Sequence, residues 1–133
     1  MTLPKTTSIL IAALALLALP ATGSANTATR HQNPHLQVTV SLTPTKASVG
    51  DRLRLHFSVT NTGERPHSVS ISYGYDSPTV SEGWGMSAIT LAPHTTWSTT
   101  VHRRARAAGD YRIHLRASDR FGRSHAAATA TAS

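Results

Sequence analysis

Cysteine is missing from this 133-residue sequence, so neither a disulfide bond nor a lipid attached to an N-terminal cysteine is available to the chain. Aromatic residues are scarce, at 5%, and only 6 Asp and Glu stand against 13 Lys and Arg. The folded part must therefore be held together by the packing of aliphatic side chains. Its positive charge favours anionic partners such as lipid head groups or acidic envelope polymers. Codon usage and simple solubility are the alternative explanation of that charge.

The chain also lacks an apolar run long enough to cross a bilayer. Its longest run, residues 9–19, has 11 residues, whereas a membrane-spanning helix needs about 20. Lys5 precedes the run, Pro20 ends it, and small residues follow up to Ala25. This order is typical of a secretory signal peptide over residues 1–25. We therefore expect an exported chain, periplasmic or secreted, with no transmembrane segment after processing.

Repeated alternation of apolar and polar residues is the main pattern that the sequence does contain. Residues 26–35 are polar and aperiodic, and predict a flexible lead-in. Residues 36–133 then form one domain in which apolar side chains recur at every second position, with turn residues between the runs. This pattern predicts an all-β fold, a seven-stranded antiparallel β-sandwich with Greek-key connections and no disulfide. The predicted strands cover residues 36–42, 51–60, 68–73, 86–91, 97–102, 109–119 and 124–132.

The last predicted strand is rich in alanine, the best helix former, so a C-terminal helix is the alternative. Thr129 and Thr131 interrupt the alanines, and no larger apolar side chain anchors a helical face. We therefore predict a weak strand at the edge of a sheet.

The motif A-x-G-x-Y-x-I, residues 107–113, opens the sixth predicted strand and is similar to the tyrosine corner of immunoglobulin-like (Ig-like) domains. Tyr111 matches the tyrosine whose hydroxyl bonds to the backbone across that corner, and Ile113 stands where many such domains have a cysteine. Residues 49–63, V-G-D-R-L-R-L-H-F-S-V-T-N-T-G, resemble the second strand and turn of bacterial cell-adhesion-related and fibronectin type III-like modules. The tryptophan of their third strand has no counterpart here. The resemblance implies that the predicted sandwich has the Ig-like fold. It also implies a non-catalytic binding or structural module.

A row of outward-facing basic side chains is the sharpest surface feature. Arg112, His114 and Arg116 share one face of a predicted strand, with about 6.6 Å between successive members. This spacing suits an anionic polymer. A second row, Arg52-x-Arg54-x-His56, falls on a strand that belongs to the opposite sheet in the Ig-like topology, so the two rows cannot clamp one ligand. The alternative is that both rows are solvated faces whose charge prevents aggregation.

Residues 74–85 are predicted as the longest irregular segment, and the candidate loop 73–86 around it concentrates aromatic, acidic and glycine residues. Tyr75, Asp76, Glu82 and Trp84 are candidate ligand-binding residues, because aromatic rings and carboxylates on a loop suit a sugar or a peptide. The alternative is that Trp84 folds back and plugs an open edge of the core.

Eight histidines raise the question of a metal site. No His-x-His pair occurs and cysteine is absent, which leaves His31 and His35 as the close pair. Cleavage after Ala28 would leave Thr29-Arg30-His31 at the N-terminus, a spacing that binds Cu(II). A periplasmic copper-handling protein is therefore the alternative function.

Catalytic motifs are missing: the sequence has no G-x-S-x-G elbow, no H-E-x-x-H and no glycine-rich phosphate loop. We expect no enzyme and no cofactor. The prediction is an exported binding or structural module of the cell envelope. Its partner would be a protein or an anionic envelope polymer, with no specific nucleic-acid target.

Overall fold

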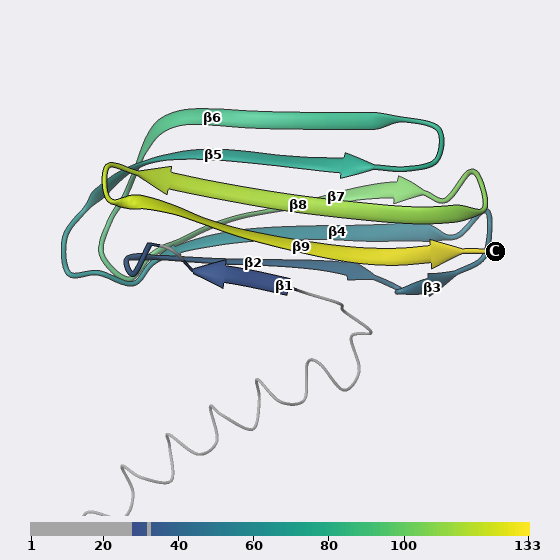
Figure 1. The fold of residues 1–133 in the computed structure, drawn as a ribbon, viewed down its shortest axis with the longest axis horizontal. Helices are drawn as coiled ribbons and strands as arrows, with labels where there is room; N and C mark the ends of the chain where they lie inside the picture. The colour runs from purple at the N-terminus through teal and green to yellow at the C-terminus, as the bar shows by residue number, and fades with distance from the viewer. Residues whose placement is uncertain (1–27, 32) are drawn as a thin grey trace, which may run out of the picture.

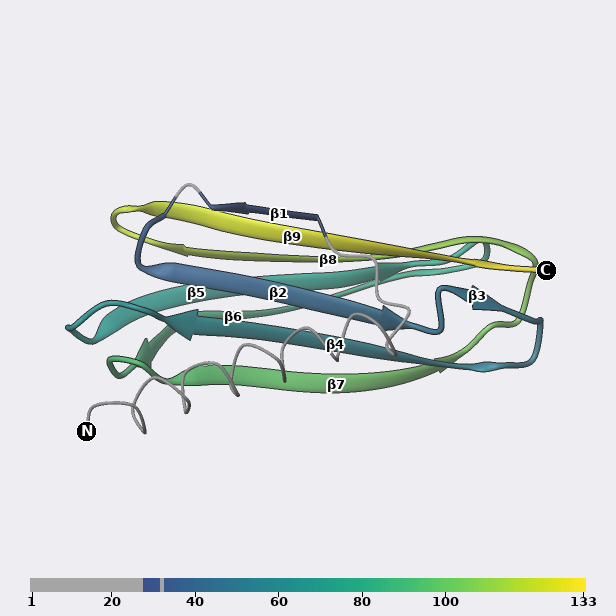
Figure 2. The same ribbon diagram turned by 90° about the horizontal axis from the view of Figure 1, so that it is seen from below.

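The computed structural model describes residues 28–31 and 33–133, and these form two stacked β-sheets (Figures 1 and 2). The predicted signal peptide, residues 1–25, lies outside the described residues. No helix long and apolar enough to cross a membrane occurs in the part of the chain that the structure describes. The strands are Ala28–His31 (β1), Leu36–Thr43 (β2), Lys46–Ala47 (β3), Arg52–Asn61 (β4), His67–Asp76 (β5), Ser81–Leu91 (β6), Thr96–Arg104 (β7), Gly109–Asp119 (β8) and Gly122–Ala132 (β9).

The two sheets have the strand order of an Ig-like sandwich. The larger sheet runs β1-β9-β8-β5-β6, with the short β3 joining β9 in parallel, and the smaller sheet is β2-β4-β7. Neighbours along these two orders pair antiparallel. Among β4 to β9, the chain changes sheet between β4 and β5, between β6 and β7 and between β7 and β8, which is the predicted Greek-key connectivity. The seven predicted strands correspond to β2 and to β4 through β9, so the all-β Ig-like prediction is confirmed.

The core consists of the alternate side chains that both sheets send inward. β4 alternates between buried and outward positions along its length, and β8 does the same. Phe57 and Tyr111 are among the largest side chains that are fully buried. Ile113, at the position where related domains have a cysteine, is 0% exposed. Aliphatic packing therefore occupies the place of the disulfide.

The alanine-rich segment is a strand, but the prediction of an edge position is wrong. β9 lies between β8 on one side and β1 and β3 on the other. Its inward row consists of alanines, each at most 4% exposed: Ala126, Ala128, Ala130 and Ala132. Because these side chains are small, β2 of the opposite sheet packs directly across β9. The alanines therefore set the spacing of the two sheets on this side.

The predicted flexible lead-in over residues 26–35 differs from the structure at Ala28–His31, which form β1. This strand pairs with β9 through its backbone, from Ala28 opposite Ala127 to His31 opposite Ser124. Backbone pairing needs no alternation of apolar side chains, so the polar sequence gave no signal of it.

The prediction of an irregular segment over residues 74–85 is also wrong. β5 and β6 form a hairpin closed by a turn at residues 77–80, and they pair from His67 opposite Leu91 to Asp76 opposite Ser81. Of the glycines that suggested a loop, Gly74 serves close packing within a strand. A Cβ atom at Gly74 would lie 2.5 Å from Nε2 of His114, so the glycine makes room for that ring.

The tyrosine corner is present as the resemblance implied. The Tyr111 hydroxyl donates to the carbonyl oxygen of Ala107 at 2.6 Å and accepts from the Ala107 amide at 3.2 Å. The ring is 2% exposed, so both hydrogen bonds are shielded from water. They tie the connection between β7 and β8 to the core.

Replacing Tyr111 by Phe tests this role. We expect a loss of about 1–2 kcal/mol in the free energy of unfolding, because the Ala107 amide and carbonyl lose a shielded partner. The β-sheet circular dichroism of the folded protein should not change. Tyr73→Phe, at a ring that is only partly buried, is the control. Equal losses in the two variants, measured by denaturant unfolding, would contradict a special role for the corner.

Candidate functional site

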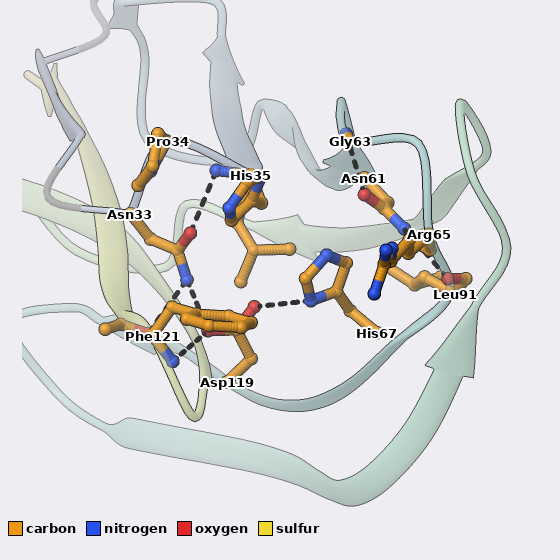
Figure 3. A network of polar contacts seen from close by, with 12 residues as sticks. Asn33, Pro34, His35, Asn61, Gly63, Arg65, His67, Leu91, Asp119 and Phe121 are labelled. Atoms are coloured by element: carbon orange, nitrogen blue, oxygen red, sulfur yellow. Dashed lines mark hydrogen bonds and ion pairs between the residues drawn. The ribbon is translucent and has the colours of Figure 1, made fainter.

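A network of polar side chains lies at the end of the sandwich where β2 and β5 begin and β8 ends (Figure 3). Its centre is the Asp119 carboxylate, whose side chain is 2% exposed. Oδ1 accepts from Nδ2 of Asn33 at 2.6 Å and from the Phe121 amide at 2.7 Å. Oδ2 lies 3.0 Å from Nδ1 of His67. Oδ1 thus accepts two hydrogen bonds, whereas the buried Oδ2 has the ion-pair contact with His67 and no hydrogen bond from the described residues.

Two histidine rings stack beside this carboxylate. The ring centroids of His35 and His67 are 5.1 Å apart, and the ring planes differ by 23°. Phe121 presents its ring at a steep angle to both, with centroid distances of 5.5 Å and 5.7 Å. The side-chain oxygen of Asn33 accepts from the His35 amide at 2.9 Å, which fixes the start of β2. The rings line a cavity of about 660 Å³, with Arg65 and Arg120 also on its wall.

The turn opposite the two rings is built by Asn61, which is 0% exposed. Its side-chain nitrogen donates to the carbonyl oxygens of Arg65 and Leu91, and its side-chain oxygen accepts from the Gly63 amide at 2.9 Å. Gly63 faces both rings. A Cβ atom there would lie 3.2 Å from Nδ1 of His35 and 3.5 Å from Nε2 of His67. The glycine therefore makes room for both imidazoles.

Sequence reasoning paired His35 with His31, whereas the structure places His35 against His67. The side chain of His31 lies outside the described residues. His67 and Asp119 were missed because they come from β5 and β8, and only the sheet brings them together. Within the described ranges, 28–31 and 33–133, no three His, Asp or Glu side chains converge where a metal ion could be held.

The predicted basic row of β8 lies on the outer face of the larger sheet, and Arg112, His114 and Arg116 are all exposed. A hollow of about 390 Å³ runs along this row and is lined by all three and by His125 of β9. Asp76 is at one end of the hollow, with Oδ2 4.0 Å from Nε2 of His114. Four basic side chains thus share one depression.

The second basic row, Arg52, Arg54 and His56 of β4, lies on the outer face of the smaller sheet. The two rows are therefore on opposite sides of the sandwich, as predicted. Arg52 pairs across the sheet with Arg104, and Arg54 pairs with His102. Nδ1 of His56 is 2.8 Å from the Thr100 hydroxyl. Burial, and then the charge of Arg54, lower the pKa of His56, which disfavours the charged form of this imidazole.

The candidate residues of the 73–86 segment are spread over the two strands of the hairpin. Tyr75 is 2% exposed and its burial raises the pKa of the hydroxyl. The half-buried Trp84 packs against the core and stacks on Tyr73, with centroids 5.2 Å apart. The Arg103 guanidinium lies 5.6 Å from the Trp84 ring centroid. Trp84 is thus packed against the core at the edge strand β6, as in the alternative interpretation of this segment.

Glu82 holds this arrangement in place. Nε and Nη2 of Arg103 donate to its two carboxylate oxygens at 2.7 Å and 2.9 Å, a bidentate ion pair across the gap between β6 and β7. The hydrogen bonds from Arg103 lower the pKa of Glu82 below its ordinary value of 4.5. Glu82 therefore supports the packing of Trp84 and is not free to bind a ligand.

Changing Glu82 to Gln should lower the melting temperature at pH 7 by a few degrees, as expected for a partly exposed ion pair. Because the folded-state pKa is lowered, the stabilisation is present above pH 4.5 and is lost as pH falls through the folded-state value. Wild type and variant should thus converge in melting temperature at acidic pH. Glu64→Gln is the control, since that side chain is 85% exposed. A constant difference at every pH would contradict the ionic origin.

No protein-family model matches the chain, and no curated protein matches it in sequence. Among solved structures, the chain is similar to the CARDB domain of the PF1109 protein from Pyrococcus furiosus in complex with di-metal ions. The identity is 16% and the TM-score 0.55, over 77% of this chain and 90% of that chain. It is also similar to E. coli alpha-2-macroglobulin, with 19% identity and a TM-score of 0.53, over 72% of this chain but 6% of that protein. These likenesses show the fold alone, that of an Ig-like β-sandwich module.

Proposed function

We propose that the chain is an exported, non-catalytic binding module of the cell envelope whose β8 row binds an anionic envelope polymer. The observation that carries the proposal is the hollow on the larger sheet, into which Arg112, His114, Arg116 and His125 all project. Alternate strand residues project on one side about 6.6 Å apart, so the row presents a line of hydrogen-bond donors to successive anionic groups.

The surroundings of the row suit an extended ligand. Ser72 and Gly74 of β5 are the partners of Arg116 and His114 on one side, and Ala127 is the partner of His114 on the other. These small side chains leave the basic groups standing above a flat sheet. A polymer chain can therefore lie along β8 without displacing bulky neighbours, and Asp76 is the acidic group that meets it at one end.

The aromatic segment carries no part of this proposal. Tyr75 is buried, Trp84 packs on the core, and Glu82 is bound to Arg103. Of the predicted binding residues, those of the β8 row and Asp76 at the end of its hollow have exposed side chains.

A double variant, Arg112→Gln with Arg116→Gln, tests the β8 row. With inorganic polyphosphate as the probe at low salt, we expect the Kd to rise about 10- to 30-fold, since each surface contact between a cation and an anion is worth about 1 kcal/mol. The dependence of the logarithm of the affinity on the logarithm of the salt concentration should also become shallower. Titration calorimetry at two salt concentrations measures both.

The matched control is Arg52→Gln with Arg54→Gln, which removes the same charge from an equally spaced row on the opposite sheet. We expect it to retain most of the affinity. Equal losses in the two double variants would mean that net charge alone attracts the polymer, and the β8 proposal would fail.

Export is tested separately. When the full chain is produced in a bacterium, we expect it in the periplasmic fraction or the medium, with a mass lower by that of about 25 residues, the usual length of a signal peptide. Lys5→Glu should slow processing, because a positive charge precedes the apolar run of a signal peptide. A full-length chain retained in the cytoplasm would refute the envelope location and leave the binding assay unaffected.

A further inference from the structure

We propose that the anionic polymer on the β8 row is an acidic polysaccharide, a chain of sugar units that carry carboxylate groups. This inference rests on the proposed function and names the ligand class for the same face of the larger sheet. The carboxylates bind to the arginines of the row, and the sugar hydroxyls bind to serine side chains next to Arg116.

A second hollow adjoins the β8 row on the outer face of the larger sheet. Its volume is about 270 Å³, and Arg116 belongs to its lining as well as to that of the first hollow. Its wall comes from β8, β5 and β6, which lie side by side in this sheet (Figure 1). We call it the serine hollow, because four serines line it: Ser70, Ser72, Ser87 and Ser118. One cationic group and four hydroxyl groups therefore share one depression.

The register of the strands places serine hydroxyls beside the Arg116 side chain. Ser72 is the partner of Arg116 across the β5–β8 pair, and Ser70 is the partner of Ser118, two residues further along β8. Directly opposite residues of an antiparallel pair have Cβ atoms about 5 Å apart. A sugar unit whose carboxylate binds to Arg116 can thus reach both strands with its hydroxyls. Gly85, the partner of Ser72 on β6, has no side chain to obstruct the unit.

The hydroxyls of the serine hollow are available to a ligand. Those on exposed residues belong to Ser70, Ser72 and Ser87. Across residues 28–31 and 33–133, no protein group makes a hydrogen bond with a hydroxyl of this hollow. The outer face of the smaller sheet differs, because the Thr60 and Thr96 hydroxyls lie 2.7 Å apart and the Thr39 hydroxyl pairs with that of Ser58. Hydroxyls there bind one another, whereas those of the serine hollow can donate to and accept from a ligand.

This mixture of groups favours a polysaccharide over other polyanions. Polyphosphate and polyglutamate supply anionic acceptors for Arg116 but no hydroxyl groups for the serines. A sugar unit with a carboxylate supplies both, since the carboxylate accepts two hydrogen bonds from a guanidinium and the hydroxyls bond to serine hydroxyls. Hydrogen bonds between neutral groups are weaker than those to charged groups. We therefore expect the arginines to supply most of the affinity and the serines to supply the selectivity.

A double variant, Ser70→Ala with Ser72→Ala, tests the inference, with polygalacturonate oligomers as the probe and polyglutamate of similar length as the comparison. Titration calorimetry should give a Kd for polygalacturonate that is about 5- to 30-fold higher, because two neutral hydrogen bonds are lost. The Kd for polyglutamate should not change. The salt dependence of the polygalacturonate affinity should also stay as in wild type, because no charge is removed.

The matched control is Ser41→Ala with Ser98→Ala, which removes two hydroxyls from the outer face of the smaller sheet. Ser41 is the partner of His56 in the second basic row, so the control also changes a serine beside a basic residue. It should bind polygalacturonate as tightly as wild type does.

The outcomes separate this inference from the proposed function. If Arg112→Gln with Arg116→Gln weakens the binding of polygalacturonate and the double serine variant does not, the polysaccharide inference is overturned and the β8 row stands. Equal losses for polygalacturonate and polyglutamate in the serine variant would also overturn it. Tighter binding of polyglutamate than of polygalacturonate by wild type would assign the face to an acidic protein. If neither double variant weakens the binding of any of the three polyanions, both proposals fail.

Discussion

The structure depends on one constraint: two sheets without a covalent cross-link stay together only through the apolar side chains that each sends inward. Leu55 and Phe57 of β4 and Ile113 and Leu115 of β8 are each at most 1% exposed. Where related domains join these two strands by a disulfide, this chain relies on contacts that are weak singly and strong in number. Such contacts have no direction of their own, so cohesion requires strict alternation along every central strand. Polar chemistry is then confined to the outer faces and the two ends.

Alternation was enough to predict the fold, because it is a local property that a strand carries in its own residues. The seven strands could be predicted on this basis, whereas the tyrosine corner and the opposite placement of the two basic rows were implied by the resemblance to Ig-like domains. The sequence was misleading where backbone pairing or close approach decides the structure: β1 pairs without apolar side chains, and Gly74 lies under His114 within a strand. The meeting of His67 with Asp119 could not be predicted, since it depends on how two strands, far apart in the sequence, end at the same edge of the sandwich.

Acidic and basic side chains lie in different parts of this structure. Acidic side chains serve the structure: Asp119 anchors the network of Figure 3, Glu82 holds Arg103, and Asp51 accepts from the Ser48 amide. Arginines and histidines instead occupy the outer faces of both sheets. Because these three carboxylates lie in turns and at edges, basic side chains outnumber acidic ones along the outer rows of β4 and β8. This excess of positive charge is the basis of the polymer-binding proposal.

The row of alanines on β9 has a consequence for how this sandwich can change over generations. Where β2 packs across β9, the sheets are as close as methyl groups allow, and any larger residue would force them apart. At the opposite margin the half-buried Trp84 and Trp97, on β6 and β7, border solvent and have room to be replaced. We therefore expect the two margins of the sandwich to differ in how well they tolerate substitutions. The alanine positions on β9 should tolerate few changes, whereas changes, including those that create new recognition surfaces, can accumulate along the aromatic margin.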